Sequence, residues 1–332
     1  MKKRVLISLL MWCCLTATAQ YRPDILGEGF EALTIEQPTT YDGECVTTLV
    51  RHTPLEGVTR AVLYVHGYND YFFQREMAET FIERGWQFYA VDLRRYGRSQ
   101  REWQTPFAVV DMEEYFEDID AAIDIMQQEG MEEIVLMAHS TGGLTTPLYC
   151  HHNRESLRVD GLILNSPFFD MNLGGGFMES VGSPAVSLMG ALFKNWEVQG
   201  GSDAIGGYAR SIHRDYDGEW SFDPSLKRLN SLPITAGWFR AIHTAQRELQ
   251  RGLDIPCPIL VMYSDKSVWG EYSEEYMTSD SVLDVADIAK YAPRLGSNIT
   301  QREIQGGMHD LSLSAENTRA EFYNAVFEFL AY

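Results

Sequence analysis

The chain has 332 residues, of which 45% are apolar, and a formal net charge of −20 at pH 7. This length suits one large α/β domain with room for an insertion, and the apolar fraction is sufficient for a substantial core. The sequence has no short repeat or low-complexity tract, which excludes a fibrous or disordered chain. A strongly negative protein repels nucleic acid and anionic lipid surfaces, so neither is expected as a partner.

Residues 1–19 are expected to be a signal peptide. Three basic residues at positions 2–4 precede the apolar stretch 5–15, and an Ala-x-Ala cleavage site ends at Ala19. The apolar stretch is shorter than the roughly 20 residues that a membrane span needs. Cleavage would change the net charge from −20 to −23. The sequence therefore predicts an exported protein, periplasmic or secreted, with no stable membrane span after cleavage.

Three cysteines lie beyond the predicted signal peptide: Cys45, Cys150 and Cys257. Their spacing matches neither a CxxC pair nor a metal site. Buried thiols are expected, and one disulfide remains open because export permits it.

Apolar strands alternate with helical patterns from residue 61 onward, which predicts a mostly parallel sheet with helices on both faces. Strands are expected at 61–65, 86–93, 134–138, 161–165, 259–263 and 299–304, and helices at 73–84, 112–128, 141–151 and 317–330. Ahead of them, residues 45–52 alternate in the manner of an antiparallel edge strand.

Residues 168–255 interrupt this alternation, because no strand pattern is visible there. The stretch is too long for a structureless loop in a compact domain. It predicts an inserted, mostly helical cap between the core segments 20–167 and 256–332, above the carboxyl ends of the strands, where ligands bind in open parallel sheets. Its aromatic residues either line an acyl pocket or pack the cap on the core: Phe168, Phe169, Phe177, Phe193, Trp196, Trp220, Phe222, Trp238 and Phe239. Its acidic run either binds a substrate ammonium group or forms a solvated loop: Asp215, Asp217, Glu219 and Asp223.

The pentapeptide 138–142 follows an apolar strand and reads small-x-Ser-x-Gly, with Ser140 at its centre. This pattern between a strand and a helix is typical of a nucleophile elbow, a strained turn that exposes the serine hydroxyl. Residues two positions either side of the serine must be small, and Ala138 takes the place of the usual first glycine. The turn predicts acyl transfer through a serine ester.

A serine nucleophile needs a base and an oxyanion hole. His309 follows the last expected strand in a glycine-containing loop and is the candidate base. The oxyanion hole is expected from the backbone N–H groups of Tyr68, after the first parallel strand, and Thr141, directly after the serine. Gly67 would allow a sharp turn there, and His66 is expected to hold the loop rather than to react.

The acid that orients the base is expected just beyond strand 259–263, where Asp265, Asp280 and Asp284 are candidates. Ser267 stands at the usual position of the carboxylate. Asp280 is preferred because its context matches the usual continuation, with residues 266–279 then an insertion. Each of the three could instead be a helix cap or a solvated loop carboxylate.

Four segments in this order resemble an α/β-hydrolase of the monoacylglycerol lipase and lysophospholipase type, a group related to the serine aminopeptidases: residues 66–68, 91–99, 139–143 and 307–310. The resemblance implies the α/β-hydrolase fold and a serine hydrolase that cleaves carboxylic esters, with a small acyl ester or lipid-like molecule as substrate. It implies no metal or organic cofactor and gives residues 92–99 a structural role beside the site. A serine aminopeptidase and a catalytically silent binding protein remain as alternatives.

Overall fold

A computed structural model describes residues 20–171 and 190–331 of the chain. The predicted signal peptide, Phe177 and part of the expected cap lie outside these residues. The strands are β1 (Arg22–Pro23), β2 (Phe30–Thr40), β3 (Gly43–His52), β4 (Arg60–Val65), β5 (Gln87–Asp92), β6 (Glu133–His139), β7 (Gly161–Asn165), β8 (Glu197–Gln199), β9 (Ile234–Thr235), β10 (Ile259–Ser264) and β11 (Ile299–Ile304). The helices are α1 (Arg75–Glu83), α2 (Glu114–Gln128), α3 (Gly142–His152), α5 (Gly207–Ile212), α6 (Ala236–Arg251), α7 (Val285–Tyr291) and α8 (Glu316–Phe329).

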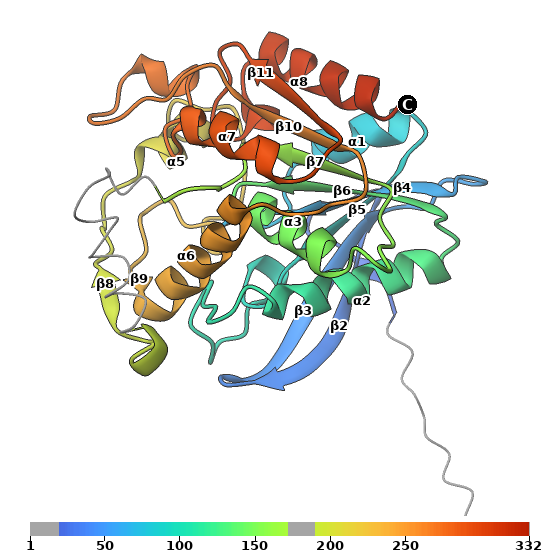
Figure 1. Cartoon of the computed structure of the whole chain (residues 1–332), viewed down its shortest axis with the longest axis horizontal. Coiled ribbons are helices and arrows are strands. Elements are labelled where there is room, and N and C mark those ends of the chain that lie inside the picture. The colour runs from blue at the N-terminus through green and yellow to red at the C-terminus, as the bar shows by residue number, and fades with distance from the viewer. Residues whose placement is uncertain (1–19, 172–189, 332) are drawn as a thin grey trace, which may run out of the picture.

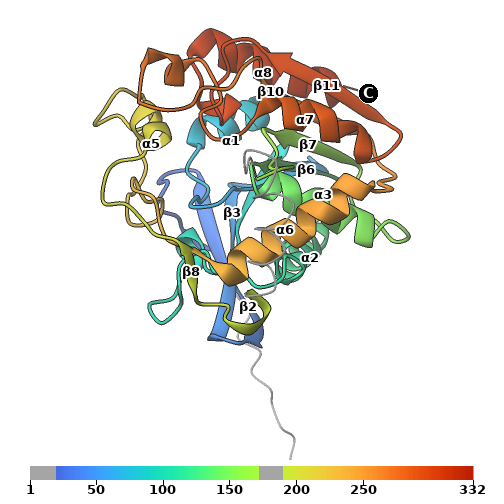
Figure 2. The ribbon, with the colours of Figure 1, turned by 60° about the vertical axis from the view of Figure 1, so that its left-hand side comes forward.

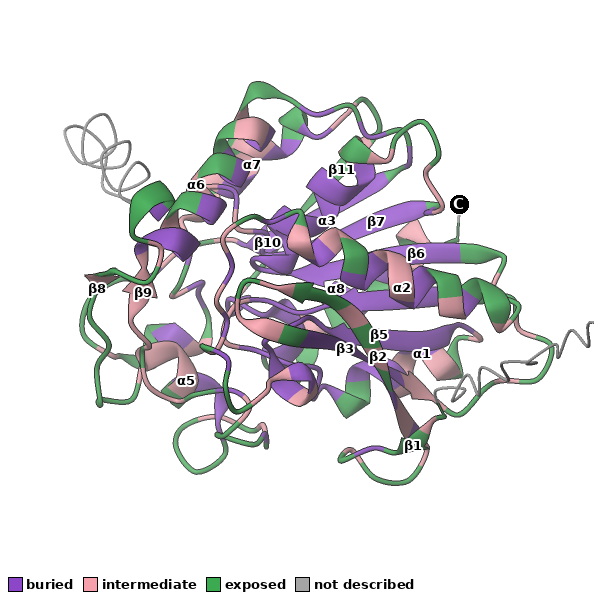
Figure 3. Ribbon diagram, turned by 90° about the horizontal axis from the view of Figure 1, so that it is seen from below, coloured by how far each residue is buried: buried purple, intermediate pink, exposed green. Residues whose placement is uncertain are grey.

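Nine strands form one sheet in the order β1-β2-β3-β5-β4-β6-β7-β10-β11. The six strands from β5 to β11 in this order run parallel, as the alternation of strands and helices predicts. Strands β4, β6, β7 and β10 are almost entirely buried because helices cover both faces, and the central residues of each strand are correspondingly apolar (Figure 3). The predicted mostly parallel sheet with helices on both faces is confirmed.

The sheet lies between two layers of helices, and each layer forms a hydrophobic cluster with one face of the sheet (Figure 1). Helices α2, α3, α6 and α7 pack on one face of the sheet, through residues such as Ile119, Leu144 and Ile242. Figure 2 shows α2, α3 and α6 side by side on this face. Helices α1 and α8 cover the other face through Phe81 and Phe322.

One expectation about strands was wrong, and further strands were missed. Strand β3 is antiparallel but lies inside the sheet, because it pairs with β2 on one side and β5 on the other. Strand β2 was missed because only one of its faces is well covered and Pro38 interrupts its pattern. Within the expected cap, β8 and β9 form a small antiparallel pair. They are only three and two residues long, too short to produce a periodic signal.

The described part of segment 168–255 divides between two places. Helix α6 belongs to the layer that covers the sheet, where Ala241 and Leu249 are buried in the core beside α3. Elements β8, α5 and β9 instead lie together at one end of the sheet (Figures 1 and 3). The turns after β4, β6 and β10 open at this same end, which brings the expected site residues under the segment.

The cysteines Cys45, Cys150 and Cys257 are buried, free thiols. Over the part of the chain that the structure describes, no helix is long and apolar enough to cross a bilayer.

Candidate active site

Ser140 stands between β6 and α3 with a backbone φ of 53°. This left-handed conformation is uncommon for a residue other than glycine and marks a strained turn. The turn is held to the end of the neighbouring strand, since the Ser140 N–H donates to the Asn165 carbonyl at 3.1 Å and the Phe168 N–H donates to the Ser140 carbonyl at 3.0 Å.

Glycines at two positions make room for this turn. A Cβ atom on Gly142 would lie 2.5 Å from the carbonyl oxygens of both Val65 and His66, so no larger residue fits. A Cβ atom on Gly67 would lie 2.9 Å from the Ser140 Cβ. Gly67 does not have a positive φ, so it is needed for close approach to the serine rather than for the sharp turn that its position predicts.

His309 lies after β11, and its Nε2 is 3.1 Å from the Ser140 Oγ. Its loop is fixed on both sides: the Ser264 hydroxyl donates to the Gly307 carbonyl at 2.6 Å, and the Met308 N–H donates to the Ser314 hydroxyl at 2.9 Å. The structure thus brings together two side chains that the sequence places 169 positions apart.

Asp280 completes a chain of hydrogen bonds. Its Oδ2 lies 3.0 Å from the His309 Nδ1, and its Oδ1 accepts the N–H groups of Val282 and Leu283, each at 2.8 Å. The carboxylate is fully buried. Its two oxygens therefore have separate partners, one holding the loop and one facing the imidazole.

The backbone explains how Asp280 reaches this position. The Asp280 N–H donates to the Lys266 carbonyl at 2.9 Å, and the Val268 N–H donates to the Asp280 carbonyl at 2.8 Å. Residues 266–279 therefore leave the sheet and return to the point where they left it. Ser267, at the usual place of the acid, pairs with Asp280 across this bridge and donates its hydroxyl hydrogen to the Leu283 carbonyl at 2.8 Å.

The other two acid candidates serve the backbone. Asp265 accepts the Gly306 N–H at 2.8 Å, and Asp284 accepts the Ala286 N–H at 3.0 Å as the N-cap of α7. Both roles match the loop and capping alternatives that their positions allow.

The two expected oxyanion donors flank the serine. Tyr68 and Thr141 line the same cavity as Ser140 and His309. Among residues 20–171 and 190–331, neither backbone N–H has an acceptor. Thr141 is the N-cap of α3, so its amide also lies at the positive end of that helix.

His66 fixes the orientation of the Tyr68 amide. Its Nδ1 lies 2.8 Å from the Gly67 carbonyl, and its Nε2 accepts the Leu93 N–H at 3.1 Å. The second contact requires a neutral ring with its proton on Nδ1, which therefore donates to the carbonyl. Burial lowers the pKa of His66 and so favours this neutral form. Because the carbonyl and N–H of a trans peptide point in opposite directions, holding the Gly67 oxygen directs the Tyr68 N–H away from it.

A profile of the serine aminopeptidase S33 family matches residues 57–315. The chain belongs to this family. One curated relative, the AB hydrolase superfamily protein YisY of Bacillus subtilis, is 34% identical over 112 residues. The match covers 33% of this chain and 38% of that protein, so the chain spans well under half of the relative's length.

Two solved structures have a similar fold. A soluble variant of the monoglyceride lipase from Saccharomyces cerevisiae, in complex with a substrate analog, superposes with a TM-score of 0.63 at 15% identity and covers 94% of each chain. The monoacylglycerol lipase of Paleococcus ferrophilus gives a TM-score of 0.59 at 19% identity, over 86% of this chain and 98% of that one. Together with the family match, they establish the α/β-hydrolase fold.

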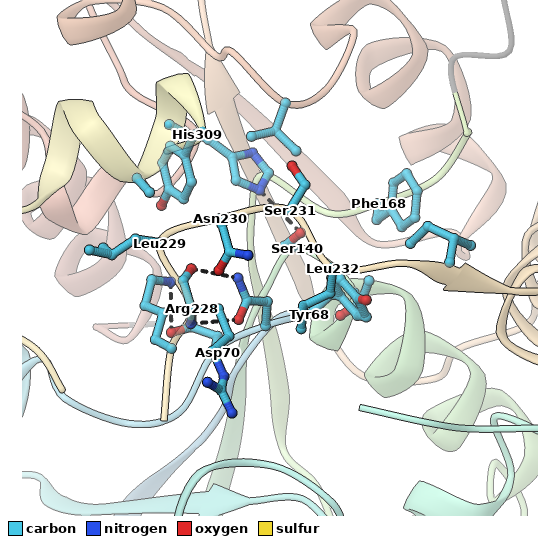
Figure 4. A pocket seen from close by; sticks show the side chains of 18 of the residues that line it. Tyr68, Asp70, Ser140, Phe168, Arg228, Leu229, Asn230, Ser231, Leu232 and His309 are labelled. Carbon is cyan, nitrogen blue, oxygen red and sulfur yellow. Dashed lines mark hydrogen bonds and ion pairs between the residues drawn. The ribbon is translucent and has the colours of Figure 1, made fainter. Parts of the chain in front are cut away.

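In this S33 family member, a cavity of about 320 Å³ lies over Ser140 and His309. Figure 4 shows Phe168 on one side of the serine and Arg228 and Leu229 on the other. The cavity lining includes Leu232, Ile234 and Trp238, which are apolar, and Asp70, Lys227 and Asn230, which are polar. The wall therefore offers both an apolar surface and a polar one.

Sequence reasoning missed the buried charges of this cavity. The Lys227 Nζ lies 2.8 Å from the Asp70 Oδ1, and both side chains are buried. Burial alone would raise the pKa of Asp70, but Lys227, together with His139 and His66, more than offsets this effect, and the pKa is lowered to about 2. His139, beside the serine, has its Nδ1 3.7 Å from the other Asp70 oxygen. Asp70 is near the oxyanion loop in sequence and could have been noticed, whereas Lys227 carries no local signal.

Most of the described cap aromatics lie outside the cavity lining. Of the residues named above, Phe168 and Trp238 line the cavity. Phe169 is buried in the core, Phe222 packs on Phe73, and Phe193 and Trp196 are exposed. The acidic run also lies away from the cavity lining, where Asp217 pairs with Arg210 at 2.7 Å and Glu219 approaches Arg319 at 3.4 Å. Across the described residues, no group of His, Cys, Asp and Glu is placed to hold a metal ion.

Proposed function

We propose that the protein is a serine hydrolase that cleaves carboxylic esters, with Ser140 as nucleophile, His309 as general base and Asp280 as the acid that orients it. One observation carries the proposal: Asp280, His309 and Ser140 form a continuous hydrogen-bonded chain, with separations of 3.0 and 3.1 Å, that ends in the cavity. A nucleophile, a base and an orienting carboxylate at such distances are what serine acyl transfer requires.

The mechanism follows from the hydrogen-bond directions. Asp280 accepts a hydrogen bond from the His309 Nδ1–H, which leaves Nε2 free to take the hydroxyl proton of Ser140. As that proton moves, the Ser140 Oγ attacks the ester carbonyl carbon. The N–H groups of Tyr68 and Thr141 stabilise the negative oxygen of the tetrahedral intermediate, a contribution of about 2.7–4 kcal/mol for each donor.

Collapse of the intermediate breaks the bond to the leaving alcohol, which takes the proton from His309. Water then attacks the acyl-Ser140 ester and gives a proton to His309. The second tetrahedral intermediate releases the carboxylic acid, and the proton returns to the Ser140 Oγ. No metal or organic cofactor enters either half-reaction.

The cavity wall favours a substrate with an apolar acyl group and a polar alcohol. Phe168, Leu232 and Trp238 provide an apolar surface for acyl carbons, whereas Asn230 and the Asp70–Lys227 pair provide hydrogen-bonding groups. This division supports a lysophospholipase-like or monoacylglycerol lipase-like ester hydrolase, acting on a small acyl ester or lipid-like molecule. The solved monoglyceride lipases with the same fold are consistent with this choice.

An aminopeptidase is the alternative that the family description favours. Such an enzyme needs a carboxylate near the serine to bind the substrate ammonium group. In the described cavity lining the carboxylate is Asp70, whose charge is balanced by Lys227 at 2.8 Å. Because this pairing leaves the described lining without an unbalanced carboxylate, it favours the ester hydrolase over the aminopeptidase. A silent binding protein is less consistent with an intact nucleophile, base and acid.

The test is a comparison of substrates with one purified protein. Hydrolysis of p-nitrophenyl esters and monoacylglycerols of increasing chain length is measured beside that of aminoacyl p-nitroanilides, for the wild type and for Ser140→Ala. We expect ester hydrolysis that the substitution abolishes. Aminoacyl-anilide hydrolysis that exceeds ester hydrolysis would favour the peptidase, and activity that survives in Ser140→Ala would reject the mechanism.

If the protein is exported as its N-terminal sequence predicts, it reaches its substrates in the periplasm or outside the cell. Edman sequencing or mass spectrometry of the mature protein from the native host should give an N-terminus at Gln20. A mature N-terminus at Met1 would contradict the proposed cleavage.

A further inference from the structure

The oxyanion loop, residues 66–73, contacts a segment that is distant in the sequence, residues 222–228. This segment lies between β7 and β10, in the region where the sequence predicts an inserted cap. Four residues of the loop after Tyr68 each contact it: Asn69, Asp70, Tyr71 and Phe73. The segment therefore does more than cover the cavity, because it is bonded to the loop that carries one of the two oxyanion donors.

One contact joins Asn69 to the backbone of Arg228 in both directions. The Asn69 Nδ2 donates to the Arg228 carbonyl at 2.9 Å, and the Arg228 N–H donates to the Asn69 Oδ1 at 2.8 Å. Both residues belong to the cavity lining, where Figure 4 labels Arg228. An amide side chain is suited to this exchange, since it offers one donor and one acceptor side by side. Asn69 also has a φ of 51°, a conformation that asparagine tolerates better than most residues.

The neighbouring residues extend the contact. Asp70 binds Lys227 at 2.8 Å, and the Tyr71 hydroxyl accepts the Asp223 N–H at 2.9 Å. The rings of Phe73 and Phe222 pack with their centroids 5.1 Å apart. Of these four residues, Asn69 directly follows Tyr68 in the chain, and the Tyr68 backbone N–H is one of the two proposed oxyanion donors.

The Tyr68 amide is thus bounded by fixed groups on both sides. On the N-terminal side, His66 holds the Gly67 carbonyl at 2.8 Å. On the C-terminal side, Asn69 holds the chain to Arg228. The Tyr68 ring itself packs between Phe107 and Trp238, with centroid distances of 5.5 and 4.9 Å. Without the contact to Arg228, the backbone at Asn69 could rotate, and this rotation would move the neighbouring Tyr68 N–H.

We infer that Asn69 is a positioning residue for the reaction, which aims the Tyr68 N–H at the oxyanion by anchoring the loop to the backbone of Arg228. The inference rests on the proposed function, because an oxyanion donor has a role only if acyl transfer occurs. It assigns segment 222–228 a part in transition-state stabilisation as well as in covering the cavity. Groups that aim a donor at developing charge act on the transition state more than on bound substrate.

The experiment compares Asn69→Ala and Asn69→Gly with the wild type in steady-state ester hydrolysis. Glycine accepts the positive φ without strain, so it removes the side-chain bonds while preserving the backbone conformation. We expect both variants to lower kcat by about 10- to 100-fold, because a donor displaced by a fraction of an ångström loses much of its effect. KM should change by less than about twofold, since ground-state binding is unaffected.

Inhibitor binding separates positioning from a general structural effect. A trifluoromethyl ketone forms a tetrahedral adduct with Ser140, so its affinity should fall in parallel with kcat. A non-cleavable ether analogue of the ester carries no developing oxyanion, so its inhibition constant should stay unchanged.

Asn153→Ala is the matched control. The Asn153 Nδ2 donates to the Tyr149 carbonyl at 3.0 Å at the end of α3, away from the cavity lining. The Asn153→Ala variant therefore also loses an asparagine-to-backbone contact, as the Asn69 variants do, but it should retain wild-type kcat.

Two results would overturn the inference. Wild-type kcat and ketone affinity in both Asn69 variants would show that the contact does not position the amide, while leaving the proposed function intact. An equal loss of affinity for the ketone and for the ether would show that Asn69 shapes the cavity rather than the oxyanion hole. Absence of any ester hydrolysis by the wild type would instead reject the proposed function, and this inference with it.

Discussion

Asp280→Asn is the substitution whose effect the structure defines most closely. The side chain keeps its size, so the fully buried position should tolerate it. The Asp280 Oδ1 accepts two backbone N–H groups at 2.8 Å, from Val282 and Leu283. An asparagine must keep its oxygen there, because its NH₂ group cannot accept these bonds. The NH₂ group is therefore forced into the position that faces the His309 Nδ1.

This orientation sets the tautomer of the base. A donor facing Nδ1 requires that nitrogen to accept, so the proton of a neutral His309 moves to Nε2. Nε2 then donates toward the Ser140 Oγ and cannot take its proton. Loss of the correct tautomer at an otherwise intact serine triad lowers kcat about 10⁴-fold, which is about 5.5 kcal/mol of transition-state stabilisation.

The assay is p-nitrophenyl ester hydrolysis near neutral pH, with thermal unfolding of each variant measured in parallel. We expect a kcat loss of about 10³- to 10⁴-fold for Asp280→Asn with little change in KM. Asp265→Asn and Asp284→Asn are matched controls, since each carboxylate accepts one backbone N–H at 2.8 and 3.0 Å and neither contacts His309. Both should stay within a few fold of the wild type.

Wild-type kcat in a folded Asp280→Asn variant would contradict the role of Asp280 as the orienting acid. Loss of activity in Asp265→Asn or Asp284→Asn instead would contradict it equally. Either result would mean that the 3.0 Å contact between Asp280 and His309 is not the one that orients the base.

Three further predictions concern stability, and each is measured by urea unfolding. Gly142→Ala places a Cβ atom 2.5 Å from the carbonyl oxygens of Val65 and His66, so it should cost about 1–3 kcal/mol or more, and an unchanged midpoint would contradict the crowding. Asp70→Asn leaves Lys227 buried without its partner, which should cost about 3–5 kcal/mol at pH 7. Because the pKa of Asp70 is lowered from 3.8 to about 2, this difference should shrink as the pH falls from 3.8 toward 2, whereas a constant difference would rule out the ion pair as its cause. Burial lowers the pKa of His66 below 6.5. The neutral ring therefore stabilises the folded state above pH 6.5, and this stabilisation is lost as the pH falls below that value. His66→Gln should therefore lose less stability than the wild type between pH 7 and pH 5, and parallel curves would refute this.

The sheet was predictable from the sequence because its parallel strands are buried on both faces. Strand β7 was predicted at its observed bounds, and β10 within one residue, since continuous apolar runs have few alternatives. Strand β2 escaped notice because its exposed positions break the pattern, and so β3 was mistaken for an edge.

The serine and the histidine were predictable for a different reason. Ser140 has a local signature in the strained turn, and His309 has a fixed place after the last strand. Asp280 was ambiguous, because residues 266–279 separate it from the strand that it follows. The backbone pairing that places Asp280 beside Ser267 depends on the folded loop, and no local sequence pattern predicts it.

The contacts of the oxyanion loop could not be predicted at all. Asn69 and Arg228 are 159 positions apart, and the bonds at Arg228 use its backbone, which is independent of residue type. Lys227 would be expected on the surface from its chemistry, and its burial against Asp70 follows only from how segment 222–228 packs.

The most direct test of the account is the site of covalent labelling by a fluorophosphonate, read by intact mass and peptide mapping of the folded protein. We expect one adduct, on Ser140, that is absent after heat unfolding and in Ser140→Ala. Folded protein that takes no label, or takes it on another residue, would contradict the claim that this hydroxyl is the activated nucleophile.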